Sequence, residues 1–211
     1  MLAELDVPSA LAAFGVGAAL GAFPGPVQVL LVSESSRGGL RRGLRVMLGA
    51  NGTFAVFLLL LAAGLTAIEP STTFLRVIRV AGGAFLVYLG IDGIRGALRP
   101  PGDEEEAPGR RLHPTTRGVL AVVLNPGGYL FLATTASAIL ADAAEAGGRP
   151  QALLTALAML AGVSVVDAAT VLLGTGSRRA FGDRVLRWLA LALAVVLVGL
   201  GVVYVVAGVS G

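Results

Sequence analysis

Six apolar stretches, each long enough to cross a bilayer as a helix, constrain this chain more than any other feature of its sequence. A transmembrane helix needs about 20 apolar residues to span the hydrocarbon core. The stretches cover residues 7–32, 43–66, 74–97, 118–141, 151–174 and 185–208. They predict an all-α integral membrane protein of six transmembrane helices, with a single membrane domain over residues 1–211 and the lipid bilayer as its partner.

The composition agrees with a chain surrounded by lipid. Only 14% of the residues are charged, against about 25% in a soluble domain. The arginines are dispersed among short loops without a basic stripe, so no nucleic-acid partner is predicted. The chain has no cysteine and a single histidine, His113, in a Pro- and Arg-rich loop. Disulfides and thiolate metal sites are therefore excluded, and neither a metal nor a cofactor is predicted.

Arginine placement predicts the orientation of the spans. Only Arg76, Arg79 and Arg149 lie in or near the loops after the second and fourth stretches. The others follow the first, third and fifth stretches: Arg37, Arg41, Arg42, Arg45, Arg95, Arg99, Arg110, Arg111, Arg117, Arg178, Arg179, Arg184 and Arg187. Positive residues concentrate on the cytoplasmic side of membrane proteins. We therefore expect a multi-pass protein of the plasma membrane with both termini outside the cytoplasm, and a cytoplasmic linker over residues 98–117.

Each half of the chain contains one early helix break. The first break is Pro24-Gly25-Pro26 and the second is Asn125-Pro126 followed by two glycines. Three spans followed by three spans place the two halves in opposite orientation, as in transporters with inverted repeats. A 3+3 inverted repeat is therefore a hypothesis that the sequence supports through these breaks.

Polar residues and breaks recur at one depth in the predicted spans. At 1.5 Å of rise per residue, Asn51, Asn125 and Asp167 lie roughly 10–13 Å from the cytoplasmic interface, as do both breaks. Backbone groups freed by a break are tolerated in a membrane only where protein, water or solute satisfies them. The layer is our candidate site for substrate or a coupling ion, formed by Pro24, Gly25, Pro26, Gln28, Asn51, Asn125, Pro126 and Asp167.

Asp167 is the most informative residue of this layer. A carboxylate in a membrane helix costs roughly 2.5–3.5 kcal/mol on insertion scales, so it should face a cavity or a partner. Three roles stay open: binding a solute ammonium, exchanging a proton, or pairing with Asn51 or another structural donor. Asp92, by contrast, lies near a span end with Arg95 three residues later, a common surface pair.

These residues, in this order, resemble the lysine-exporter (LysE/RhtB) family of amino-acid exporters. The resemblance covers nearly the whole chain, and its most specific segment runs from Pro24-Gly25-Pro26 to Leu44. The other matching segments are Ala81–Gly90, Leu124-Asn125-Pro126, and Gly162-Val163-Ser164 with Asp167. The resemblance implies a homodimer that exports amino acids or related metabolites, driven by the proton gradient. Two departures from the family pattern bear on substrate choice. Val27-Gln28 follows the first break, and Asn51 stands where the family often has an acid.

Two other functions stay open at this stage. One is a cation or heavy-metal exporter, whose affinity would rest on Asp167 and backbone carbonyls. The other is a non-transporting membrane assembly factor that docks through the acidic run Asp103–Glu106. An intramembrane enzyme is not predicted, because no span holds a histidine base and Asp92 lies too near the interface to form an aspartyl dyad with Asp167.

Overall fold

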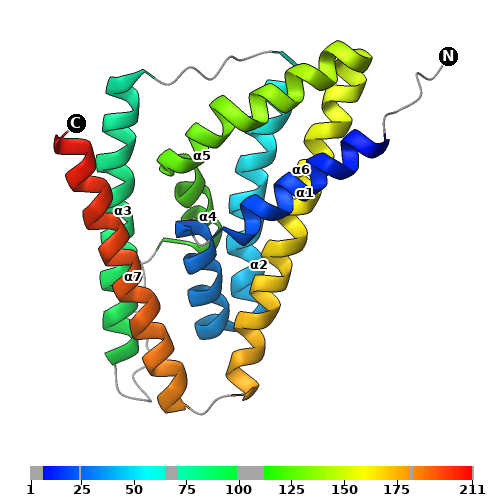
Figure 1. Cartoon of the computed structure of the whole chain (residues 1–211). Coiled ribbons are helices and arrows are strands. Elements are labelled where there is room, and N and C mark those ends of the chain that lie inside the picture. The colour runs from blue at the N-terminus through cyan, green and yellow to red at the C-terminus, as the bar shows by residue number, and fades with distance from the viewer. Residues whose placement is uncertain (1–6, 24, 65–70, 99–111, 181–182, 211) are drawn as a thin grey trace.

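The computed structural model describes residues 7–23, 25–64, 71–98, 112–180 and 183–210, which form helices and short connections without a strand (Figure 1). This confirms the predicted all-α class. The elements are α1 (Val7–Ala22), α2 (Pro26–Ala62), α3 (Thr72–Leu98), α4 (Pro114–Val123), α5 (Pro126–Phe131), the π-helical turn η1 (Leu132–Ala136), α6 (Ser137–Ala180) and α7 (Asp183–Ser210).

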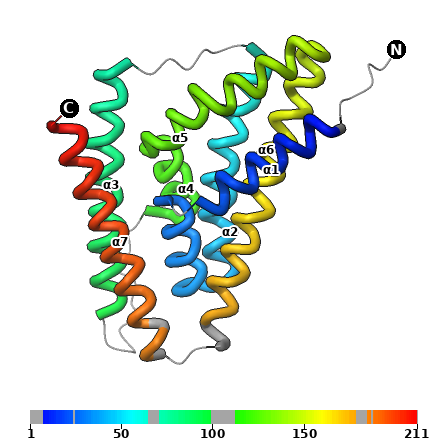
Figure 2. Tube along the Cα trace, viewed as in Figure 1, coloured from blue at the N-terminus to red at the C-terminus, as the bar shows by residue number. Residues whose placement is uncertain are grey.

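Two of these helices reverse direction at glycines. In α2 the non-helical residue is Gly39, with φ 72° and ψ −171°. In α6 the reversal occupies Gly147 and Gly148, and Gly148 has φ 69° and ψ −165°. Positive φ values of this kind are open to glycine because it has no Cβ. Each of α2 and α6 therefore consists of two limbs, as the Cα trace shows (Figure 2).

The reversal at Gly39 differs from the predicted connection. The sequence suggested a loop between residues 32 and 43, whereas the structure continues helical hydrogen bonding on both sides of one glycine. Arg37, Arg41 and Arg42 thus lie on helix rather than on a loop. Because the two limbs meet at a tight turn, side chains from residues 33–36 and 42–45 come close together.

The predicted breaks coincide with helix ends. Pro24 lies outside the described residues, but Gly25 next to it is extended and Pro26 begins α2. In the second half α4 ends at Val123, and Asn125 caps α5 by accepting a hydrogen bond from the Gly127 amide at 3.1 Å. Proline suits the first position of a helix because the amide it lacks has no intrahelical partner there.

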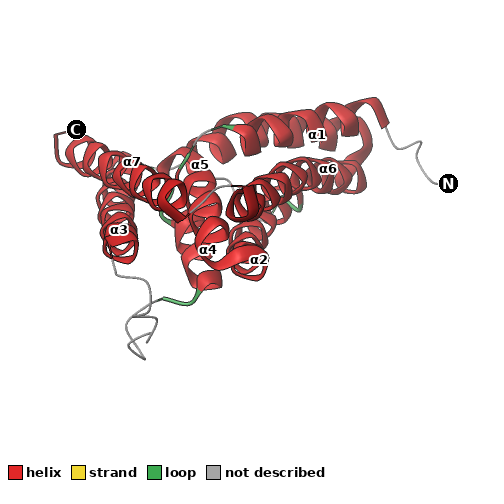
Figure 3. Cartoon of the chain, turned by 90° about the horizontal axis from the view of Figure 1, so that it is seen from below, coloured by secondary structure: helices red, strands yellow, loops and turns green. Residues whose placement is uncertain are grey.

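The helices pair closely through glycines. The main pairs are α3 with α7, α2 with α6, α1 with α6, and α2 with α4 (Figure 3). A Cβ on Gly17 of α1 would overlap the Met159 carbonyl, and one on Gly162 of α6 would overlap the Phe14 carbonyl. Small residues let membrane helices approach to backbone contact. The glycines therefore act mainly as packing positions.

The α2–α4 pair repeats this arrangement. A Cβ on Gly49 of α2 would overlap the Thr115 carbonyl, and one on Gly118 of α4 would overlap the Val46 carbonyl. Each of the two pairs thus contains one glycine from each helix, directed at the backbone of the other. The reciprocal contacts account for four of the 30 glycines of the chain.

The α3–α7 contact allows a matched test of this packing. An added Cβ at Gly201 would lie 2.6 Å from the Gly83 carbonyl oxygen, whereas Gly199 on the same helix has nothing within 4 Å. We expect Gly201→Ala to lower the free energy of unfolding by about 1–3 kcal/mol through overpacking. Gly199→Ala should be neutral or slightly stabilising. Thermal unfolding in detergent measures both variants, and equal midpoints would show that α3 and α7 are not in close contact.

Two apolar cores hold the pairs together. The first lies between α1, the second limb of α2, η1 and α6. The second joins α2, α3, α4, α6 and α7 around the start of α2. The fully buried members include Leu58, Leu132 and Met159 in the first core and Leu30, Leu31 and Leu197 in the second. Apolar contacts therefore hold the start of α2, just after the first break, in place.

By length and apolarity, four helical segments of the described chain are able to cross a membrane. They are Pro26–Ala62, Thr72–Leu98, Pro126–Ser177 and Arg187–Ser210, while the apolar segment Pro8–Ala22 is shorter. The predicted number of six crossings stays a prediction.

Candidate functional site

Asp167 is buried in the protein rather than exposed to lipid. Its side chain sits on α6 with 1% of the residue surface exposed. The Gln28 amide on α2 donates a hydrogen bond to Asp167 Oδ1 at 2.5 Å. Oδ2 is equally buried and has no hydrogen-bond partner among the described residues. A buried polar atom without a partner is uncommon in folded proteins, so this oxygen marks a place where a ligand group fits the chemistry.

A second polar pair lies beside the first. Asn51 on the second limb of α2 donates to the Ser164 hydroxyl on α6 at 3.1 Å. Ser164 precedes Asp167 by three residues, so both lie on one face of α6. The Asn51 side chain also lies within hydrogen-bonding reach of the Asp167 carboxyl. Gln28, Asn51 and Asp167, predicted to share a layer, therefore form one cluster with Ser164.

The backbone beside this cluster carries free donors. Gly25, the N-cap of α2, has no side chain to bond the amides of the first turn, and Pro26 has no amide. The Val27 amide makes no hydrogen bond with the described residues. A helix N-terminus of this kind favours a negative group through its amides and its dipole. Gln28 belongs to the same turn, and its side chain links this end of α2 to the Asp167 carboxylate.

The second break makes no hydrogen bond to the cluster within the described residues. The Asn125 side chain caps its own helix through Gly127, and Pro126 is buried. The carbonyl of Leu124, next to Asn125, approaches α3 so closely that a Cβ on Gly82 would overlap it. Asn125 makes no hydrogen bond to Gln28, Asn51 or Asp167 among the described residues. The backbone next to the break therefore packs against α3, and the place of Asn125 and Pro126 in the site stays a prediction.

A buried ion network was not predicted from the sequence. Glu34 on α2 and Arg117 on α4 are each 1% exposed, and Arg117 Nη1 donates to Glu34 Oε1 at 2.8 Å. Arg117 Nη2 also donates to Asp92 Oδ2 on α3 at 2.7 Å. Arg42, from the second limb of α2, pairs with the other oxygen of Glu34. Two acids and two bases thus neutralise one another where α2, α3 and α4 meet.

This network changes the interpretation of Asp92. The sequence suggested a surface pair with Arg95, but Asp92 pairs across the bundle with Arg117. Glu34 and Arg117 both lay just outside the predicted spans, at 7–32 and 118–141. No sequence signal indicated the network: the run Ser33-Glu34-Ser35-Ser36 was expected in a loop, whereas the structure buries all four residues.

Other predicted features can be placed only in part. The acidic run at residues 103–106 lies outside the described residues. His113 caps α4 by accepting a hydrogen bond from the Thr115 amide at 3.3 Å. Within the described ranges no three His, Cys, Asp or Glu side chains come together as a metal site.

Comparison with protein families gives one match. The family model described as LysE type translocator matches residues 18–208, which include both breaks, Asp167 and the ion network. Comparisons with curated proteins and with solved structures gave no match.

Proposed function

Since the chain belongs to the LysE type translocator family, which transports amino acids or related compounds across membranes, we propose that it exports a small amino acid through the Asp167 cluster. The observation that carries this proposal is the buried Asp167 carboxyl, with Oδ1 bonded to Gln28 and Oδ2 without a partner. An acid inside a membrane protein is costly and marks a solute or ion path by default.

Both charged groups of an amino acid find a complement at this site. The Asp167 carboxylate matches an ammonium, and the uncapped N-terminus of α2 at Val27 matches a carboxylate. Gln28 belongs to the same helical turn and contacts Asp167, so the two subsites are adjacent. A zwitterion bridging them would be held at both ends.

The charge of the cluster bears on substrate choice. Of the side chains Gln28, Asn51, Ser164 and Asp167, Asp167 alone is an acid. One carboxylate balances one ammonium, so we propose a neutral amino acid rather than a dibasic one as the preferred substrate. Asn51 stands where relatives often have a second acid, and its amide already donates to Ser164. A second positive group would therefore stay unpaired at this site.

We further propose six crossings arranged as a 3+3 inverted repeat. The reversals support it, since Gly39 and Gly148 share nearly the same backbone angles, φ 72° and φ 69°. The packing supports it too, because α1 meets α6 and α4 meets α2 through the same reciprocal glycine contacts. Each half of the repeat would then begin with the helix that contains its proline-glycine break.

The proposed orientation places both termini outside the cytoplasm. The start of α1 and the end of α7 lie at one end of the bundle, opposite the turn of α2 and the end of α3 (Figure 1). The latter end carries Arg41 and Arg45, so the arginine rule assigns it to the cytoplasm. Proton-driven export from a plasma membrane and a homodimer remain parts of this proposal that rest on the family resemblance.

Counterflow into proteoliposomes tests the proposed site. Liposomes loaded with one unlabelled amino acid at a time, from neutral, dibasic and acidic panels, are diluted into the same labelled amino acid. We expect uptake with a neutral member and little with dibasic members. Uptake confined to dibasic amino acids would contradict the charge argument.

Gln28→Leu should lower this counterflow by roughly five- to tenfold, because the hydrogen bond that orients Asp167 is lost. Thr170→Ala is the matched control. Its hydroxyl lies one turn from Asp167 on α6 and bonds only to the Val166 carbonyl of its own helix, at 2.9 Å. Equal rates for both variants would remove Gln28 from the site, and equal losses would indicate a general packing effect.

A further inference from the structure

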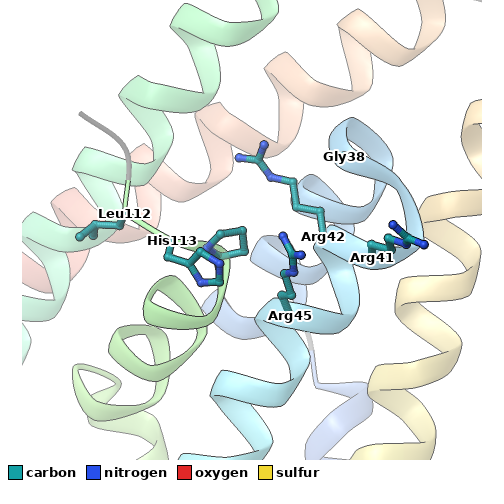
Figure 4. A pocket seen from close by; sticks show the side chains of 7 residues that line it. Gly38, Arg41, Arg42, Arg45, Leu112 and His113 are labelled. Carbon is teal, nitrogen blue, oxygen red and sulfur yellow. The ribbon is translucent and has the colours of Figure 1, made fainter. Parts of the chain in front are cut away.

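A basic pocket lies outside the Asp167 cluster, at the turn of α2. It has a volume of about 510 Å³ and is lined by Gly38, Arg41, Arg42, Arg45, Leu112, His113 and Pro114 (Figure 4). The arginines come from the first turns of the second limb of α2, and the remaining wall comes from the start of α4. The pocket is therefore formed where two helix N-termini meet, each of which favours an anion.

The arginines of this pocket differ in their partners. Arg42 is paired with Glu34 beneath it. Arg41 and Arg45 are exposed and make no ion pair or hydrogen bond with any residue in the described part of the chain. His113 uses Nδ1 to accept from the Thr115 amide, which leaves its Nε2 as the donor. Within the described residues, two guanidinium groups without an ion-pair partner and an imidazole donor thus line one space, and no described acid lines it.

The surface beside the pocket is apolar. Leu40, Leu44 and Leu48 follow one another at intervals of four residues along the second limb of α2 and are 41%, 38% and 69% exposed. Residues at this spacing lie on one helix face. Arg41 and Arg45 border the same exposed face, one residue after Leu40 and Leu44. A charged pocket thus continues into a row of exposed leucines that leads away from the turn.

We propose that this pocket binds the phosphate headgroup of an anionic phospholipid, with an acyl chain along the leucine row. A free phosphate would use the arginines but leave the leucines without a role, whereas a phospholipid matches both. Basic pockets between helices at the cytoplasmic face are suited to anionic headgroups. The site is separate from the proposed transport site and does not depend on it.

Native mass spectrometry of the purified full chain in neutral detergent tests this inference. The probe is phosphatidylglycerol, with phosphatidylcholine as the zwitterionic comparison. We expect selective retention of phosphatidylglycerol and a loss of roughly tenfold or more in its affinity for the double variant R41Q/R45Q. R184Q/R187Q is the matched control, because it removes two exposed arginines near the start of α7 and should bind as the parent does. R41K/R45K should retain most of the binding, which separates charge from folding.

Three results would overturn the proposal. Equal losses in R41Q/R45Q and R184Q/R187Q would indicate general surface charge. Equal retention of phosphatidylcholine would remove the role of the anionic headgroup. Displacement of the lipid by millimolar inorganic phosphate, with phosphate itself bound at the same arginines, would identify the ligand as a free anion.

Discussion

Replacing Asp167 with asparagine is expected to reduce counterflow by about 10- to 100-fold, because one charge-assisted hydrogen bond to the solute ammonium contributes roughly 1.5–3 kcal/mol. The substitution keeps the shape of the side chain and its contact with Gln28. It removes the negative charge that a buried ammonium requires. Measuring initial counterflow rates at substrate concentrations below half-saturation reports this loss directly.

The same variant separates transport from a structural role. A buried carboxylate with one unbonded oxygen costs stability, so Asp167→Asn should unfold at the same temperature as the parent or a higher one. A structural acid would give the opposite result, with a lower unfolding temperature and a general loss of folded protein. Asp142→Asn is the matched control, since Asp142 is an exposed acid on the first limb of α6.

A pH gradient extends the test to coupling. If a proton and the solute ammonium compete for the Asp167 carboxyl, each crossing of the solute in one direction is matched by a proton in the other. Asp167→Asn should then abolish solute accumulation driven by a pH gradient. Gradient-driven transport at the parental rate in this variant would show that coupling takes place elsewhere.

The cluster around Asp167 was accessible from sequence because helices have a regular rise. Counting 1.5 Å per residue from the expected interface placed Gln28, Asn51 and Asp167 near one another, and the structure brings Gln28 within 2.5 Å of Asp167. The same count placed Asn125 at this depth. Depth alone does not give direction around the helix axis: the Leu124 carbonyl beside this break packs against Gly82 of α3, and Asn125 makes no hydrogen bond to the cluster within the described residues.

The ion network was less accessible, for a related reason. Glu34 and Arg117 are 83 residues apart in sequence and meet only because α4 packs against α2. Each lies one or two residues beyond a predicted span, where hydropathy assigns charges to solvent. Helix boundaries read from hydropathy carry an error of several residues. For Glu34 and Arg117, a boundary error of this size determines whether the charge is predicted to be buried or exposed.

Replacing Arg117 with glutamine is expected to lower the free energy of unfolding by about 3–5 kcal/mol, because it breaks a buried ion pair with Glu34 and a second ion pair with Asp92. Arg117 is buried and bonds both Glu34 and Asp92, so one substitution removes two ion pairs. Arg95→Gln is the matched control on exposed helix surface and should change stability by less than about 0.5 kcal/mol. Thermal unfolding in detergent compares the two variants.

The double variant E34Q/R117Q distinguishes a specific pair from a general loss of packing. With both charges removed, Arg42 and Asp92 remain as one base and one acid, and the two amides are able to bond each other. The double variant should therefore be more stable than the sum of the single losses predicts, by about 1 kcal/mol or more. Additive losses would mean that Glu34 and Arg117 contribute independently. The cluster would then stabilise the junction of α2, α3 and α4 through volume rather than charge.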